Sequence, residues 1–233
     1  MKSVTKSTLA AAAVLVVLLW ALPNADAQTY TLDQVLAKMG EVGRSFRSLE
    51  ASVERTTVDI IVDDKKIEFG KVFFKRAKNA QPQIRFDFTK PAAYTALISE
   101  GKARVYNPKL KQVQEYALGK DEDKAEFLLI GFGQSNEQIR QAYNVALVGE
   151  ESLGGQRVSV LELRPKSERV AAMFASIRLW LDQKQWIPLQ TKATESGSRG
   201  DYQIVKFTNI QLNGDIKDSV FRLNLPRDVQ IVR

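Results

Sequence analysis

The 233-residue chain contains no cysteine and no histidine. Without them there is no thiol or imidazole nucleophile, no Ser-His-Asp triad and no zinc site of the usual ligands. Two acidic runs, Asp63-Asp64 and Asp121-Glu122-Asp123, are better explained as a hairpin tip and a helix start than as metal sites. Paired carboxylates of a hydrolase do not stand out. We therefore expect no metal, no cofactor and no enzymatic activity.

Long hydrophobic runs are lacking except near the N-terminus. Two lysines precede an apolar run over residues 9–22, and residues 25–27 (Ala-Asp-Ala) place small side chains where signal peptidase cuts. The run is shorter than the ~20 residues needed to cross a bilayer. A signal peptide over residues 1–27, cleaved after Ala27, is favoured over an uncleaved anchor. We expect residues 28–233 to form one exported domain, stabilised by its own core because disulfides are impossible.

The net charge is positive. The whole chain carries 34 basic and 27 acidic residues, or +7, and loss of two lysines and one aspartate with the first 27 residues leaves 32 and 26, or +6. This charge suits an acidic partner, an anionic membrane face or simply a soluble surface. The basic residues are scattered rather than clustered with aromatics, so we expect no nucleic acid partner.

An N-terminal helix is predicted by the capping box of Thr31 and Gln34. Apolar residues then follow at helical spacing: Leu32, Val35, Leu36, Met39, Val42, Phe46 and Leu49. We expect one helix that is interrupted or ends near Gly40 or Gly43 and covers one face of a sheet.

Most of the remaining chain alternates apolar and polar residues, which predicts strands. One hairpin is expected with strands over 51–62 and 67–76 and its tip at Asp63–Lys66, and another with its tip at Glu100–Lys102. Further strands are expected over residues 84–88, 112–118, 144–148, 157–164, 177–181, 187–195, 202–212 and 229–232. About ten or eleven strands with few helices predict one strongly curved antiparallel sheet or an incomplete barrel.

The segment between residues 121 and 143 changes period. It holds an apolar cluster that includes Phe127, Leu128 and Ile130, followed by a predicted helix over 136–143. The cluster is either an ordinary helix that covers the core or a lid whose apolar face occupies a ligand cavity. A short helix or loop is also expected over residues 170–174.

One apolar row of the sheet ends in a charge. Alternation places Val72, Phe74 and Arg76 on one side of a strand, opposite Lys71, Phe73 and Lys75. The candidate lining residues of a cavity on this side are Val72, Phe74, Ile84, Phe86 and Phe88. Each is either plain core or a ligand contact. Arg76 either faces inward or lies at a strand end and extends to water.

An ordered set of residues along most of the chain resembles the LolA family of periplasmic lipoprotein carriers. The matching residues are Gly70, Phe74-Lys75-Arg76, Ile84-Arg85-Phe86, Pro91, Leu97-Ile98-Ser99, Glu100-Gly101-Lys102, Tyr106-Asn107-Pro108, Gln112, Gln114, Trp180-Leu181-Asp182, Ile187-Pro188, Phe221 and Leu225-Pro226. The sequence departs from the family pattern after Arg76, where five residues precede Pro82. It also has Glu100 in place of the usual aspartate.

The resemblance implies a mainly β fold, an unclosed, strongly curved antiparallel barrel with a helical lid. It implies a monomeric periplasmic chaperone that receives acylated lipoproteins from an inner-membrane ABC transporter and delivers them to an outer-membrane acceptor. It also implies that Arg76 holds the lid. Phe127, Leu128 and Ile130 are the candidate lid residues of the apolar cluster described above. The alternatives are a periplasmic sensor of lipid or lipoprotein with the same fold, or a carrier of free lipids.

Overall fold

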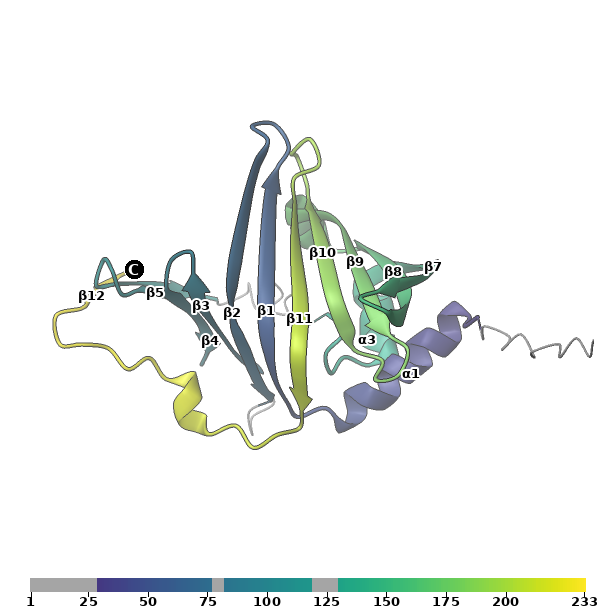
Figure 1. Cartoon of the computed structure of the whole chain (residues 1–233), viewed down its shortest axis with the longest axis horizontal. Coiled ribbons are helices and arrows are strands. Elements are labelled where there is room, and N and C mark those ends of the chain that lie inside the picture. Colours follow the sequence, from purple (N-terminus) through teal and green to yellow (C-terminus); the bar gives the residue numbers. More distant parts are fainter. Residues whose placement is uncertain (1–28, 77–81, 119–129) are drawn as a thin grey trace, which may run out of the picture.

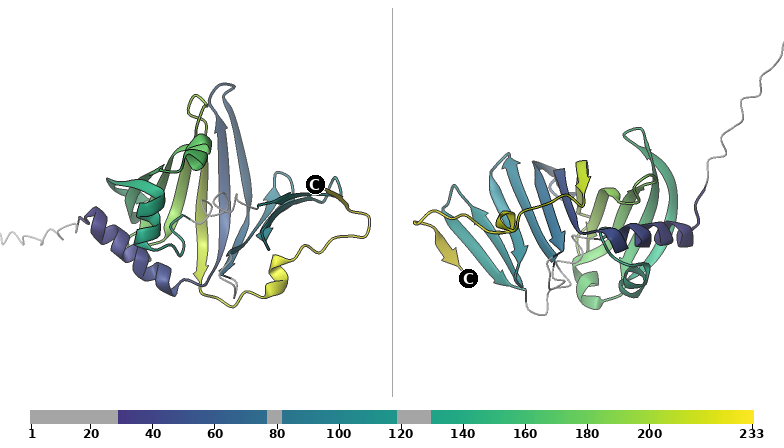
Figure 2. Two further views of the ribbon diagram at one scale, coloured as in Figure 1. Left: turned by 180° about the vertical axis from the view of Figure 1, so that it is seen from behind. Right: turned by 90° about the horizontal axis from the view of Figure 1, so that it is seen from below.

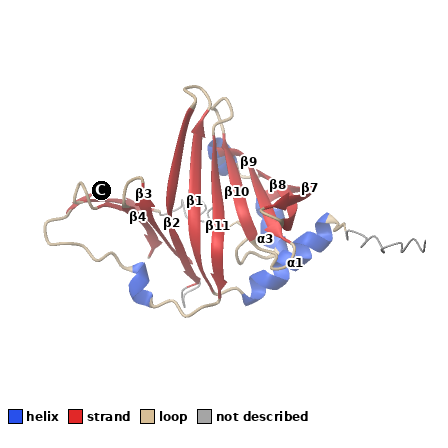
Figure 3. Cartoon of the chain, in the orientation of Figure 1, coloured by secondary structure: helices blue, strands red, loops and turns tan. Residues whose placement is uncertain are grey.

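The computed structural model of the chain describes residues 29–76, 82–118 and 130–233. The described part is dominated by one sheet of 12 strands (Figure 1, Figure 3). The strands are β1 Ser48–Asp59, β2 Asp64–Arg76, β3 Pro82–Lys90, β4 Tyr94–Ser99, β5 Lys102–Asn107, β6 Gln112–Ala117, β7 Tyr143–Leu153, β8 Gln156–Pro165, β9 Phe174–Asp182, β10 Pro188–Glu195, β11 Tyr202–Leu212 and β12 Gln230–Val232.

The sheet is curved but not closed. Its order is β12-β6-β5-β4-β3-β2-β1-β11-β10-β9-β8-β7, so the two outermost strands are not paired with each other. Neighbours are antiparallel except β12, which pairs in parallel with β6. The expected mainly β, unclosed antiparallel architecture is therefore confirmed.

The α-helices of the described residues lie on the concave side of the sheet (Figure 2). They are α1 Leu32–Ser45, α3 Asn136–Ala142 and α4 Glu168–Met173. Val35, Leu36 and Met39 of α1 and Ile139 of α3 share a buried cluster with concave side chains of the sheet, among them Leu179. The covering role expected for the N-terminal helix is thus confirmed.

The N-terminal helix does not stop at its glycines. Its capping box forms as predicted, but α1 continues through Gly40 and Gly43 to Ser45. A Cβ on Gly43 would lie 2.7 Å from the carbonyl oxygen of Gln134. The glycine therefore lets the segment before α3 approach the helix backbone, and this tertiary contact outweighs the low helix propensity of glycine.

The expected position of the first hairpin tip was wrong by three residues. β1 ends at Asp59, β2 begins at Asp64, and Ile60 to Asp63 form the turn. The backbone N–H groups of Ile61 and Val62 donate to Asp59 Oδ1, and that of Ile60 donates to Asp201 Oδ1. These carboxylates fix a turn where the aliphatic run reads as strand.

The C-terminal segment crosses the convex face of the sheet. The short helix η3 Asp218–Phe221 packs Phe221 with Leu97 and Ile216, next to Phe73. Lys75 Nζ donates to the carbonyl oxygen of Ile216 at 2.7 Å. Phe73 and Lys75 therefore face the convex side, as the alternation in the sequence predicts.

Candidate functional site

The concave face of β2 and β3 carries a continuous apolar row. Val72, Phe74, Ile84 and Phe88 are buried there in one cluster with Phe132. Cross-strand pairing places Val72 opposite Phe86 and Phe74 opposite Ile84, which fixes their common face. Phe86 is half-buried and packs against the same cluster.

The loop before α3 covers this row. Ile130 and Phe132 point into the core and are 2% and 3% exposed. Ile130 caps a void of about 30 Å³ that Phe86, Phe207 and other concave side chains also line. The loop thus fills space that the curved sheet would otherwise leave open.

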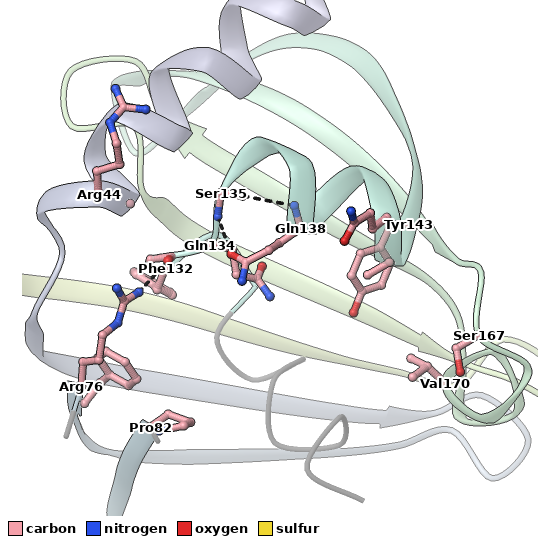
Figure 4. Close-up of a pocket in the computed structure, with 15 residues that line it drawn as sticks. Arg44, Arg76, Pro82, Phe132, Gln134, Ser135, Gln138, Tyr143, Ser167 and Val170 are labelled. Atoms are coloured by element: carbon pink, nitrogen blue, oxygen red, sulfur yellow. Dashed lines mark hydrogen bonds between the residues drawn. The ribbon is translucent and has the colours of Figure 1, made fainter. Parts of the chain in front are cut away.

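An open cleft of about 720 Å³ lies beside this loop (Figure 4). Its walls come from the end of α1, the end of β2, the start of β3, the loop and helix α3, and α4. The lining residues are Gly43, Arg44, Phe74, Arg76, Pro82, Phe132, Gly133, Gln134, Ser135, Gln138, Gln141, Ala142, Tyr143, Ser167 and Val170. A volume between about 300 and 1,000 Å³ is typical of ligand pockets.

Arg76 connects the sheet to the loop. Its Nη2 donates a hydrogen bond of 2.6 Å to the carbonyl oxygen of Gly133, drawn as a dashed line in Figure 4. Gly133 has φ +78°, and a Cβ there would lie 2.7 Å from both Arg76 Nη2 and a ring carbon of Phe46. A glycine at this position therefore permits both the turn and the close approach of the arginine.

Packed aromatic rings also hold the loop against the concave face. Phe46, just after α1, stacks on Phe74 at 5.1 Å and lies 6.1 Å from Phe132. Phe132 in turn meets Phe207 of β11 edge-on at 5.3 Å. Packed rings of this kind contribute about 0.5–1.5 kcal/mol per pair beyond buried area. The loop is thus held by an apolar anchor and by one charged hydrogen bond at its edge.

The cleft walls are basic and polar above an apolar floor. Among the described lining residues the charged side chains are Arg44 and Arg76, and no carboxylate is present. Gln134 Oε1 is buried there and has no hydrogen-bond partner among the residues that the structure describes. Such a site suits an amphiphile that places an apolar chain on the floor and an acidic or hydrogen-bonding group at the mouth.

A charged cluster lies at the far end of the same concave face. Glu68 is buried, and its carboxylate accepts from Arg55 Nε at 2.8 Å and pairs with Lys66 at 2.8 Å. The Arg55 guanidinium lies 4.5 Å above the ring of Phe88. Burial opposes ionisation of Glu68, but hydrogen bonds from Lys66 and Arg55 outweigh it and lower its pKa. Burial raises the pKa of the neighbouring Tyr94 hydroxyl to about 12.

The structure places the candidate residues as follows. Val72, Phe74, Ile84, Phe86 and Phe88 share the concave face, Ile130 lies in the covering loop, and Arg76 lies at the cleft mouth. Phe127 and Leu128 lie outside the described residues.

Sequence reasoning missed the polar part of the cleft. Ser135 and Gln138 form a capping box like that of α1, a signal that marks the start of α3 and the end of the loop. Nothing in the sequence pattern pointed to Arg44 or to Phe46 as a ring partner. Arg44 lines the cleft and Phe46 stacks on Phe74 only because the C-terminal end of α1 packs next to β2.

The chain matches the family described as outer membrane lipoprotein carrier protein LolA over residues 44–224. An uncharacterized protein of Methanocaldococcus jannaschii is 23% identical over 206 residues, which is 88% of this chain and 55% of that protein. The chain thus spans about half the length of this relative.

Solved structures share the fold. An uncharacterized conserved protein from Thermus thermophilus superimposes with a TM-score of 0.53 at 16% identity, covering 86% of this chain and 98% of that one. MucB superimposes with a TM-score of 0.50 at 13% identity, covering 82% and 62%.

The described fold thus combines an apolar concave surface with a cover made of one loop and the helices α1, α3 and α4, beside an open cleft. The family match includes most of the chain, from the end of α1 to the C-terminal segment. The chain belongs to the LolA family of outer-membrane lipoprotein carrier proteins.

Proposed function

We propose that the protein is a periplasmic carrier that binds the acyl chains of lipoproteins. In this proposal it receives them from an inner-membrane ABC transporter and hands them to an outer-membrane acceptor, acting as a monomer without cofactor or catalysis. The observation that carries the proposal is the apolar row on β2 and β3, which lies under a loop that Arg76 holds through the carbonyl oxygen of Gly133.

The energetics favour a covered rather than an open site. Burial of a 16-carbon acyl chain yields about 0.8 kcal/mol per methylene, or ~12 kcal/mol gross, which is too much for ready release. Ile130 and Phe132 already occupy part of the concave surface, so the loop competes with the chain for the same contacts. The hydrogen bond from Arg76 to Gly133 further stabilises the closed position of the loop. Both effects lower net cargo affinity to a level that permits transfer.

Export is part of the same proposal. Residues 1–27 are proposed to be a signal peptide cleaved after Ala27, and residues 28–233 the mature carrier domain. Within the described residues no helix combines the length and hydrophobicity that a membrane span requires.

The proposal is tested by what the protein binds. The mature protein is purified from cells under mild conditions, and extracted material is analysed by mass spectrometry. Acylated peptides are expected. Recovery of phospholipids or fatty acids alone would favour a carrier of free lipids. A protein that carries nothing and also fails to extract lipoproteins from membrane vesicles would contradict the proposal.

A matched pair of variants localises the binding. Phe86→Asp puts a charge on the half-buried concave floor, whereas Phe69→Asp puts one on the convex face of the neighbouring strand, where Phe69 is exposed. We expect loss of bound acyl material for Phe86→Asp and wild-type recovery for Phe69→Asp.

A further inference from the structure

The tip of the β1–β2 hairpin exposes three consecutive aliphatic side chains. Ile60, Ile61 and Val62 are 48%, 64% and 67% exposed. The hairpin projects beyond the neighbouring turn between β10 and β11 (Figure 1). Exposed apolar residues occur singly on most surfaces, but a contiguous projecting run indicates a contact surface.

The backbone N–H groups of Ile60, Ile61 and Val62 are already hydrogen-bonded. The N–H groups of Ile61 and Val62 donate to Asp59 Oδ1 at 2.9 and 3.2 Å, and the N–H of Ile60 donates to Asp201 Oδ1 at 2.8 Å. Asp201 belongs to the adjacent turn, so the tip is braced from a second part of the sheet. Unsatisfied backbone donors are costly in an apolar medium, and here the protein itself satisfies them.

We propose that Ile60, Ile61 and Val62 insert into the surface of a phospholipid bilayer and dock the protein there. The shape and composition of the tip favour lipid over a protein partner. A stable protein interface needs roughly 800 Å² on each partner and is anchored by Trp, Tyr or Arg, whereas a hairpin tip is narrow and this one is aliphatic. Shallow insertion into lipid needs only a few apolar side chains.

The charged side chains next to the tip determine how deeply it inserts and whether anionic lipid attracts it. Asp63 and Asp64 are followed by Lys65 and Lys66, so the four side chains sum to zero, and Lys66 also pairs with Glu68. The acidic pair limits the depth of insertion. Lys65 and Lys66 are matched by Asp63 and Asp64, and the carboxylates of Asp59 and Asp201 also lie at the tip. Because the tip carries no excess of positive charge, anionic lipid is not expected to strengthen its binding.

The docking contact is separate from the cleft. The tip lies at the start of β2 and Arg76 lies at its end, 12 residues later, or about 40 Å along an extended strand. Docking through the tip therefore leaves Arg76 and the loop over the concave face free to move. The start of β2 would then contact the membrane, and Arg76 at its end would hold the loop closed.

The test is sedimentation of the mature protein with phospholipid vesicles free of lipoprotein. Vesicles of phosphatidylcholine should bind the wild type, and inclusion of one-fifth phosphatidylglycerol should not strengthen the binding at low or high salt. Ile61→Ser combined with Val62→Ser should weaken binding on the order of 30-fold, since both side chains are about two-thirds exposed and each loses its burial in lipid.

A control makes the same two substitutions, one isoleucine and one valine to serine, at exposed positions elsewhere. Val148→Ser on β7 and Ile231→Ser on β12 replace side chains that are 50% and 52% exposed on the two edge strands. This double variant should bind vesicles like the wild type. Ile61→Trp should give a blue-shifted emission on vesicle addition that lipids brominated near the headgroup quench, and Val148→Trp should give neither.

Three results would overturn the proposal. The Ile61→Ser/Val62→Ser variant could bind vesicles as strongly as the wild-type protein, or the wild-type protein could bind neither kind of vesicle. In the third, sedimentation velocity would show that the protein self-associates through the tip and so buries it. Acyl-peptide binding in solution is measured on the same variant. It should be unchanged, so failure of the docking proposal is distinguishable from failure of the carrier proposal.

Discussion

Replacing Arg76 with leucine should let the loop over the concave face open more often while the sheet stays folded. The side chain is exposed, and the strand end keeps its backbone hydrogen bond from Arg76 N to Arg47 O at 2.9 Å. What is lost is the hydrogen bond from Nη2 to Gly133 O. A hydrogen bond to a charged group contributes about 1.5–3 kcal/mol, and exposure to water places this one at the lower end.

A loss of about 1.5 kcal/mol shifts the equilibrium between closed and open loop by about tenfold. Hydrogen exchange at the amides of residues 130–135 should therefore accelerate by about that factor. Apparent affinity for an acylated peptide should rise by up to tenfold, because more of the protein is competent to bind. Transfer of the peptide to acceptor membranes should slow correspondingly.

Arg76→Lys is the matched control, because it keeps the charge but loses the planar fork, and it should give intermediate values. Wild-type exchange rates and wild-type transfer in the Arg76→Leu variant would show that Arg76 does not hold the loop closed. A large drop in melting temperature would also count against this role, since it would assign Arg76 to the fold rather than to the cover.

Two further predictions concern stability. Gly133→Ala should destabilise by about 1–3 kcal/mol in denaturant titration, because its φ of +78° disfavours a side chain and the added Cβ would meet Arg76. Gly101→Ala, at φ +69° with open space around it, should cost less and leave the loop unaffected. Glu68→Gln should destabilise the protein at neutral pH by about 1.5–3 kcal/mol through loss of the charged hydrogen bonds from Arg55 and other basic neighbours. Because the folded pKa of Glu68 lies below its usual 4.5, the stabilisation is present above that pH and lost as pH falls through the folded pKa. The wild-type and Glu68→Gln unfolding curves should therefore converge in acid, and a pH-independent difference would contradict the assignment.

Local pattern predicted the part of the fold that depends on nearest neighbours. Two-residue alternation placed Val72 and Phe74 on one face and Phe73 and Lys75 on the other, because side chains of a strand point alternately to opposite faces. The capping box at Thr31 likewise located the start of α1.

The errors arose where distant residues decide the local structure. The run from Ile60 to Val62 reads as strand, but the turn is braced by Asp201, 141 residues away from Ile60. Similarly, α1 passes through Gly43 because the carbonyl of Gln134 approaches it closely. Neither contact can be predicted from the local sequence pattern.

In the candidate site, too, local pattern predicted some residues while long-range contacts placed the others. The apolar floor followed from alternation, whereas the partner of Arg76 did not, because Gly133 lies 57 residues further along the chain and is placed by loop packing. The polar wall of the cleft, including Arg44 and Gln134, comes from the ends of α1 and the start of α3. Its composition depends on how these ends meet.

In the proposed function, acyl chains bind on the concave face beneath the loop. Photocrosslinking tests it most directly, using a lipopeptide with a photoreactive group on its acyl chain and mapping of crosslinks by mass spectrometry. Crosslinks are expected at Phe74, Phe86, Ile130 and Phe132, and unlabelled lipopeptide should suppress them by competition. Crosslinks confined to the convex face, or equal labelling with and without competitor, would contradict it.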